Sequence, residues 1–303
     1  MKVWGVIAGL SAAAIWGGMY AVSKVVLDVV PPFLLLSIRL ILGAAVLAAV
    51  LAATGGATLK LPQARGIVGI GLLGMGVSVG LQFVGTSLST AANASLVTSA
   101  SPAFLLLFGA LILRERITGR RLAALFLASL GILAVIDPRL ARFDPSMFRG
   151  NVVLLGAAVT WGLYSVLVKR VSGMASTTEI SLLASLGGLA LSLPLAAVEL
   201  SSPPTLAITP GLVVGVLYLG VVSTAVATYL WNKSLALLET GVVSLLFFAQ
   251  PAVGAGLGAF VLGERLTTGF WLGAALIGAG LILSIVPANA SAGSMAAVPA
   301  EEG

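Results

Sequence analysis

The stretch Ala-Ala-Ile-Trp-Gly at residues 13–17, followed by Lys24, recurs as Ala-Val-Thr-Trp-Gly at residues 158–162, followed by Lys169. The offset is 145 residues at every matched position. A second set of matches has an offset of 149 residues and pairs Pro102, Glu115-Arg116, Thr118 and Gly131 with Pro251, Glu264-Arg265, Thr267 and Gly280. The chain therefore contains two copies of one unit, and the second copy has about four extra residues before its fourth segment.

The composition is that of an integral membrane protein. Hydrophobic residues make up 59% of the 303 and charged residues only 9%, against about 25% in soluble domains. Charges, prolines and polar runs separate ten apolar segments, each near the roughly 20 residues that a helix needs to cross a bilayer. The period-2 pattern of a membrane β-barrel is missing, so we predict an all-α protein. The predicted spans are 4–27, 33–53, 66–86, 94–113, 120–136, 150–168, 180–198, 211–233, 241–262 and 269–286.

Ten spans and two copies give a domain organisation. We expect a first five-helix repeat at 1–136, a linker at 137–149, a second five-helix repeat at 150–287 and a disordered tail at 288–303. The apolar start of the chain also fits a signal peptide. Because this segment matches the start of the second copy, we interpret it as the first transmembrane helix of the mature protein.

Because five is odd, the two copies must enter the membrane in opposite directions, as inverted repeats. Arg114, Arg120 and Arg121 of the first copy correspond to Gly263, Gly269 and Phe270 of the second, so the same loop lacks its positive charges where inversion places it outside. With a cytoplasmic N-terminus, ten basic loop residues lie inside and five outside. We therefore expect both termini to be cytoplasmic, in a bacterial inner membrane.

Several functional classes are disfavoured. The chain has no Cys and no His, which removes disulfides, thiolate and imidazole metal sites, and catalytic triads with an imidazole base. The net charge is +6, but no basic cluster with interleaved aromatic residues suggests nucleic acid. The pattern GxGxxG at 69–74 and the pattern GxSxG at 76–80 both lie inside an apolar span, where we interpret the glycines as helix-packing positions. We expect no cofactor and no metal.

Two prolines, Pro102 and Pro251, lie in the middle of equivalent spans. Each lacks the amide hydrogen that would bond four residues back, which frees the carbonyls of Thr98 and Phe247. Polar residues gather at these points, among them Ser99 and Gln250. A broken helix at the same place in both halves indicates the central site of a transporter. The alternative is a structural kink satisfied by nearby Ser and Thr.

Aromatic and polar side chains share faces on several spans. Trp16, Tyr20 and Lys24 lie four residues apart, as do Trp161 and its partners Ser165 and Lys169, with Tyr164 adjacent. The tryptophans either line a cavity or fill helix packing, and the lysines either contact a substrate carboxylate or extend to water. Polar stripes on the third and eighth spans add Ser78, Gln82, Thr86, Thr224, Thr228, Trp231 and Asn232.

Three charged positions need separate treatment. Arg39 lies about seven residues inside the second span, where a charge is either a functional group or an anchor to another helix. The pairs Glu115-Arg116 and Glu264-Arg265 end the fourth and ninth spans, and we expect structural salt bridges there.

The repeated AxxWG motif and the Pro followed 13 residues later by Glu-Arg resemble the EamA type of the drug/metabolite transporter superfamily across residues 4–286. Within it the chain is similar to YddG-type exporters of aromatic amino acids and other metabolites. The resemblance implies a ten-helix bundle whose first, third, fourth, sixth, eighth and ninth helices wall a central cavity. The small four-helix multidrug antiporters of the superfamily use a glutamate in the first helix, and this chain has none there.

The sequence therefore predicts a transporter rather than an enzyme, with a small-molecule substrate and the lipid bilayer as its partners. We expect it to export small neutral or zwitterionic metabolites, amino acids with aromatic ones included, by alternating access. A carrier for nucleotide sugars or lipid-linked sugars is the alternative, and an intramembrane enzyme is disfavoured. Oligomeric state is not predicted. The candidate cavity residues are Trp16, Tyr20, Gln82, Ser99, Trp161, Tyr164, Trp231 and Gln250, with Pro102 and Pro251 at the helix breaks and Arg39, Lys24 and Lys169 as possible charge contacts.

Overall fold

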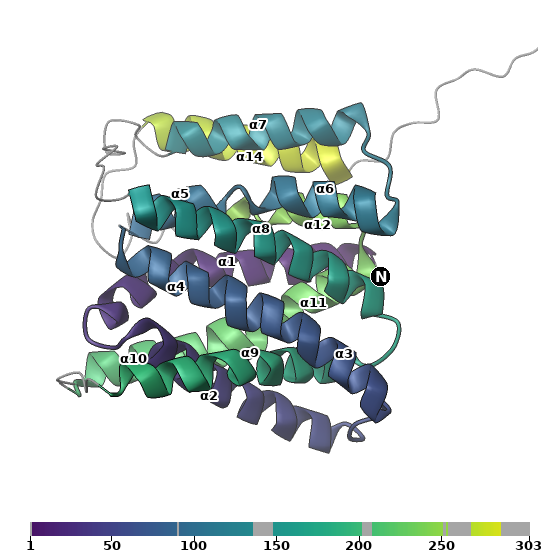
Figure 1. Cartoon of the computed structure of the whole chain (residues 1–303). Coiled ribbons are helices and arrows are strands. Elements are labelled where there is room, and N and C mark those ends of the chain that lie inside the picture. Colours follow the sequence, from purple (N-terminus) through teal and green to yellow (C-terminus); the bar gives the residue numbers. More distant parts are fainter. Residues whose placement is uncertain are drawn as a thin grey trace, which may run out of the picture.

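The computed structural model describes residues 2–89, 91–135, 148–201, 208–250, 253 and 268–285, and these residues form helices joined by short loops. The helices of the first half are α1 (Lys2–Leu27), α2 (Pro32–Ala53), α3 (Leu61–Gly71), η1 (Leu72–Ser78), α4 (Val79–Ser87), α5 (Ala91–Thr98), α6 (Ser101–Leu113) and α7 (Gly119–Val135). Those of the second half are α8 (Phe148–Val171), α9 (Thr177–Glu199), α10 (Pro210–Leu217), η3 (Tyr218–Val226), α11 (Ala227–Leu237), α12 (Thr240–Leu246) and α14 (Thr268–Ile285) (Figure 1).

Six continuous helical runs in the described part of the chain are long and apolar enough to cross a membrane. They are 2–27, 32–53, 61–87, 148–171, 177–199 and 210–237. The predicted ninth span is described only as far as Gln250, apart from residue 253. Pro251, the Glu264-Arg265 pair, residues 137–147 of the predicted linker and the predicted tail lie outside the described residues.

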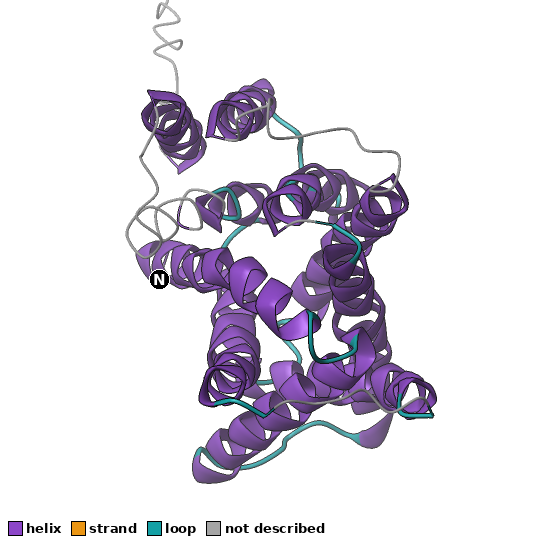
Figure 2. Cartoon of the chain, turned by 90° about the vertical axis from the view of Figure 1, so that its left-hand side faces the viewer, coloured by secondary structure: helices purple, strands orange, loops and turns teal. Residues whose placement is uncertain are grey.

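The helices lie side by side across the bundle, and each packs on more than one neighbour (Figure 1). Helix α2 packs on α9, α1 on α11, α4 on α8, and α7 on α14 (Figure 1). Seen end-on, the α7–α14 pair lies at one edge of the bundle, beside the remaining helices (Figure 2). The main core contains residues of α1, α2, α4, α8 and α11, which places the best-packed region at the centre of the bundle.

Two π-helical segments interrupt the third helical run of each half. Segment η1 joins α3 to α4, and η3 joins α10 to α11. A π turn adds one residue, so it rotates the face that follows and is frequent at functional sites. Within η3 the Thr224 hydroxyl donates to the carbonyl of Leu219, five residues back, at 2.7 Å, which matches the widened turn.

Glutamates of α9 bind backbone N–H groups at the start of α2 and just before α3, where Gln63 of α3 also accepts the Lys60 N–H at 3.3 Å. Glu199 accepts the backbone N–H groups of Phe33 and Leu34 at 3.1 and 2.8 Å, at the start of α2. Glu179 accepts those of Thr58 and Leu59, both at 3.0 Å, just before α3. The free N–H groups and the positive end of the helix dipole favour a carboxylate there. Helix α9 is thus fastened to the first half at both of its ends.

Candidate functional site

A cavity of about 470 Å³, counted with the space at its mouth, lies among the central helices. Five of the eight predicted cavity residues line it: Trp16, Tyr20, Gln82, Trp161 and Gln250. Its other lining residues are Met19, Arg39, Met75, Ser78, Val79, Thr98, Ser101, Ala157, Thr228 and Phe247. They belong to the six helical runs expected to form the wall and, through Arg39, to α2 as well.

The fourth helical run is interrupted where Pro102 predicts a break. Helix α5 ends at Thr98 and α6 begins at Ser101, with a turn at residues 99 and 100. The carbonyl of Thr98, which the proline leaves without an amide partner, accepts the Ser101 hydroxyl at 2.7 Å. The Tyr20 hydroxyl lies 2.6 Å from Thr98 Oγ1, so α1 and the break are joined at the cavity wall. Because the Thr98 hydroxyl also lies 2.7 Å from the Ala94 carbonyl and donates to it, Tyr20 is the donor in this pair.

Four aromatic rings from separate elements pack together at one end of the cavity. The Trp16 ring centre lies 5.3 Å from that of Trp161, 5.5 Å from that of Trp231 and 6.2 Å from that of Phe247. Tilted and edge-on pairs at such distances are favourable beyond the apolar area they bury. We call Trp16, Trp161, Trp231 and Phe247 the aromatic cluster.

The three indole N–H groups of the cluster have different partners. Trp16 donates to the carbonyl of Ser223 at 3.0 Å, and Trp231 donates to Ser165 Oγ at 3.2 Å. The buried Trp161 Nε1 has no hydrogen-bond partner in the described part of the chain. Since a buried donor without a partner is costly, this group is available to a ligand in the cavity.

The described residues that line the cavity extend from the aromatic cluster toward one end of the bundle. Its α8 residues are Ala157 and Trp161 and its α11 residue is Thr228, whereas Trp231, one turn further along α11, is fully buried. Beyond the cluster, α1 approaches α11 so closely that a Cβ at Gly9 would lie 2.7 Å from Ser234 Oγ. The cluster therefore closes the cavity toward the end of the bundle where α1 begins.

Three predicted cavity residues lie off its wall. Tyr164 is fully buried, packs on Trp161 with ring centres 5.0 Å apart, and has its hydroxyl 3.5 Å from Asn232 Oδ1. Trp231 lies behind Trp16 and Phe247. Ser99 donates to the carbonyl of Ser95 at 2.7 Å, within its own turn. Helical spacing alone does not distinguish a cavity wall from the layer packed behind it.

Arg39 is 3% exposed and lines the cavity. Its Nε donates to Thr224 Oγ1 of η3 at 2.7 Å. Its Nη1 lies 3.7 Å from Met19 Sδ, and the guanidinium carbon lies 5.2 Å from the centre of the Phe83 ring. Arg39 thus connects α2 to η3 and presents its charge to the cavity.

Lys24 and Lys169, the other two predicted charge contacts, lie at the ends of their helices and outside the cavity lining. Lys24 Nζ donates to the carbonyl of Ser87 at 3.3 Å and lies 4.0 Å from Asp28. Lys169 Nζ donates to the carbonyl of Leu238 at 2.8 Å. Each lysine therefore ties a helix end to the last carbonyls of a neighbouring helix, where a cation is favourable.

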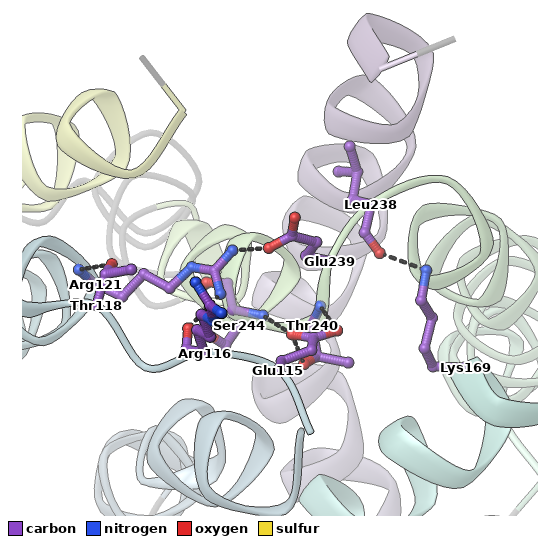
Figure 3. Close-up of polar contacts among 10 residues, drawn as sticks. Glu115, Arg116, Thr118, Arg121, Lys169, Leu238, Glu239, Thr240 and Ser244 are labelled. Atoms are coloured by element: carbon purple, nitrogen blue, oxygen red, sulfur yellow. Dashed lines mark hydrogen bonds and ion pairs between the residues drawn. The ribbon is translucent and has the colours of Figure 1, made fainter. Parts of the chain in front are cut away.

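The salt bridge expected at Glu115 is not found among the described residues, where Glu115 binds backbone amides instead. Glu115 accepts the N–H groups of Thr240 and Gly241 at 3.1 and 3.4 Å, and the Thr240 hydroxyl at 2.6 Å, so it caps the start of α12 (Figure 3). Arg121 of α7 forms an ion pair with Glu239, just before the same helix start (Figure 3). The carboxylate binds backbone amides because the N-terminus of α12 lies beside the end of α6. These contacts fasten the end of the bundle that the aromatic cluster closes.

Seven lining residues belong neither to the predicted cavity set nor to the predicted polar stripes or charge contacts: Met19, Met75, Val79, Thr98, Ser101, Ala157 and Phe247. Met75, Ser78, Val79 and Gln82 all line the cavity, and their spacing of three, four and seven residues is that of one helix face. Ser78 also donates to the carbonyl of Ala157 at 2.8 Å, which brings α8 close. The sequence does not distinguish an apolar residue that lines a cavity from the other apolar residues of the same span. It does not show where a π turn forms either.

Comparison with known proteins assigns the family. The EamA-like transporter family matches residues 3–136 and again residues 148–286. A probable amino-acid metabolite efflux pump of Escherichia coli is 29% identical over 284 residues, covering 91% of this chain and 93% of that protein. A protein of the same description from Salmonella typhimurium is 29% identical over 289 residues, covering 91% of this chain and 93% of that protein.

A solved crystal structure has the same fold, with a TM-score of 0.78 at 22% sequence identity, over 92% of this chain and 97% of its own. The matches to the family and its members cover nearly the whole chain, and the resemblance inferred from the repeated motifs is confirmed. The chain belongs to the EamA-like transporter family and is a multi-pass membrane transporter.

Proposed function

We propose that this transporter exports small neutral or zwitterionic metabolites, amino acids with aromatic ones among them, by alternating access around the central cavity. The observation that carries the proposal is a cavity inside an apolar bundle whose wall combines aromatic rings with unpartnered polar atoms. Trp161 Nε1 and Gln250 Oε1 are both buried in that wall, with no hydrogen-bond partner among the described residues. Aromatic walls with a few converging polar groups are typical of small-molecule sites. The two relatives described as probable amino-acid metabolite efflux pumps support the same substrate class.

We further propose two inverted five-helix repeats, with both termini in the cytoplasm of a bacterial inner membrane. The paired packing supports the repeat, because α1 on α11 corresponds to α8 on α4 when the halves are exchanged. The two separate family matches support it too. With this orientation the aromatic cluster and the Glu115 cap close the cytoplasmic end, so the cavity faces outward and the seal must open for loading.

The nucleotide-sugar alternative has less support. A diphosphate needs several cations, and Arg39 is the single basic residue among the described residues that line the cavity. One guanidinium beside aromatic rings suits one carboxylate better than a chain of phosphates.

A counterflow assay tests the proposal directly. Purified protein in liposomes loaded with unlabelled tryptophan, leucine, glutamate or UDP-glucose is diluted into the labelled compound. We expect labelled tryptophan and leucine to accumulate transiently, because exchange through one central site needs only the outward gradient of unlabelled substrate. Accumulation of UDP-glucose alone would favour the sugar carrier and contradict the proposal.

The same vesicles test for proton coupling. The described carboxylates are Asp28, Glu115, Glu179, Glu199 and Glu239. All five lie at helix ends or in loops, and none lines the cavity. Proton relays need such groups within the membrane. We therefore expect an imposed pH gradient to leave the amount of accumulated substrate unchanged. Concentrative uptake that a protonophore abolishes would contradict uncoupled export.

Cysteine labelling tests the orientation, since the native chain contains no Cys. Lys60 precedes α3 at one end of the bundle and Ser201 follows α9 at the other, and both are exposed. In intact cells an impermeant maleimide should label the variant Ser201→Cys and leave Lys60→Cys unlabelled until the cells are opened. The reverse pattern would place the termini outside.

A further inference from the structure

The guanidinium of Arg39 lacks a counter-charge in the described part of the chain. The two ion pairs there are Lys24 with Asp28 and Arg121 with Glu239, both at helix ends. Glu115, Glu179 and Glu199 are occupied by backbone amides of helix starts. A charge that is 3% exposed in an apolar bundle is costly unless it is paired.

The contacts of Arg39 fix its position and leave its outer edge free. Nε is used by Thr224 Oγ1, whose own hydrogen goes to the carbonyl of Leu219. Nη1 has only the thioether of Met19 at 3.7 Å, a weak acceptor. The ring of Phe83 supports the guanidinium from one side. No oxygen of the described residues binds the two terminal nitrogens, which therefore form a free fork at the cavity wall. A planar fork of this kind binds a carboxylate through two parallel hydrogen bonds.

We infer that Arg39 is the carboxylate anchor of the transport site, and that its substrates are metabolites carrying a carboxylate together with a hydrogen-bond donor. This inference rests on the proposed function and deepens it by naming the recognised group. Gln250 Oε1, unpartnered in the same wall, accepts from the donor. A protonated amine there is also favoured by the faces of Trp16 and Trp161, because a cation is attracted to aromatic rings. An α-amino acid has both groups.

A purely structural role for Arg39 would explain the Thr224 bond but leave the fork and the empty acceptor on Gln250 without a purpose. The two roles differ in what they predict for ligands. An anchor discriminates between an acid and its amide, whereas a link between helices affects both ligands equally.

The test compares ligands that differ only at the carboxylate. Thermal unfolding of the purified wild-type protein is measured against rising concentrations of leucine, leucinamide and 4-methylpentanoate, because a ligand that binds only the folded state raises the midpoint. We expect leucine to stabilise most, 4-methylpentanoate less and leucinamide least. In Arg39→Gln the concentration of leucine needed for the same shift should rise about 10- to 100-fold, the range for a lost bond to a charged group, while the response to leucinamide stays unchanged.

Two further variants keep the result interpretable. Arg65→Gln removes the same charge from an exposed position on α3 and should change no ligand response. If Arg39→Gln does not fold, Arg39→Lys keeps the cation without the fork. It should show a smaller loss of affinity, confined to leucine and 4-methylpentanoate.

Equal stabilisation of the wild-type protein by leucine and leucinamide, or an equal loss of both in the Arg39 variants, would overturn the inference even if counterflow of amino acids succeeds. Failure of amino acid counterflow, with 4-methylpentanoate still bound through Arg39, would overturn the proposed function alone.

Discussion

Replacing Gly71 with alanine is expected to remove most of the folded protein from membranes, whereas the same change at Gly69, two residues earlier on α3, is expected to do no harm. A Cβ at Gly71 would lie under 3.0 Å from the carbonyl oxygen and the Cα of Ala184 on α9. A Cβ at Gly69 would meet no atom within 4 Å. The obstacle at Gly71 is backbone, which cannot rotate away, so we expect a cost of about 3 kcal/mol or more, at the upper end for overpacked sites.

The two glycines form a matched pair because the substitution is chemically identical. Alanine is the better helix former by about 0.5–1 kcal/mol, so Gly69→Ala should be neutral or slightly stabilising, and the loss at Gly71 occurs against that preference. The measurement is the yield of monodisperse protein after detergent extraction, together with its unfolding temperature. Gly187→Ala, which would place a Cβ under 3.0 Å from the carbonyl of Val68 at the same crossing, should behave like Gly71→Ala. If Gly71→Ala and Gly69→Ala give equal yields, α3 and α9 do not cross at these glycines.

Gly69 and Gly71 also show which features of the fold the sequence predicts and which it does not. Apolar segments near 20 residues could be predicted as helices, because a backbone in lipid must satisfy its own hydrogen bonds. The glycines of the pattern at 69–74 could be interpreted as packing positions. The sequence could not show which of these glycines touches a neighbouring helix, since that depends on the partner helix. A Cβ at Gly71 would meet Ala184 and one at Gly74 would meet Tyr164, whereas one at Gly69 would meet open space.

For the candidate site, the contributing helices could be predicted, but not every side chain that lines the cavity. The family resemblance implied which six helical runs wall the cavity, and residues of all six line it, together with Arg39 of α2. Met75 and Val79 share a helix face with Ser78 and Gln82, but an apolar residue in an apolar span does not show whether it faces a cavity, a neighbouring helix or lipid. The capping role of Glu115 could not be predicted either, because no pattern in the sequence shows that the start of α12 lies beside the end of α6.

The tryptophans of the aromatic cluster allow the cavity assignment to be tested by removing a single N–H group. Trp161→Phe is expected to weaken transport about 10-fold or more, measured as the substrate concentration at half-maximal counterflow, with the unfolding temperature little changed. The reason is that the Trp161 N–H has no partner among the residues that the structure describes, so a ligand is what loses a bond when it is removed. A hydrogen bond to a charged group is worth about 1.5–3 kcal/mol, or roughly 10- to 150-fold in binding.

Trp231→Phe is the matched control, because Trp231 belongs to the same cluster and lies off the cavity wall. Its N–H donates to Ser165 Oγ, and its side chain is fully buried. The variant leaves the Ser165 hydroxyl without this donor, so it should lower the free energy of unfolding by about 1–2 kcal/mol while the half-maximal concentration stays near that of the wild type. The two variants should therefore separate, with one losing affinity and the other stability. Loss of folded protein and of transport in the same proportion for both would place Trp161 in the packing, and the unpartnered N–H would then have no part in recognition.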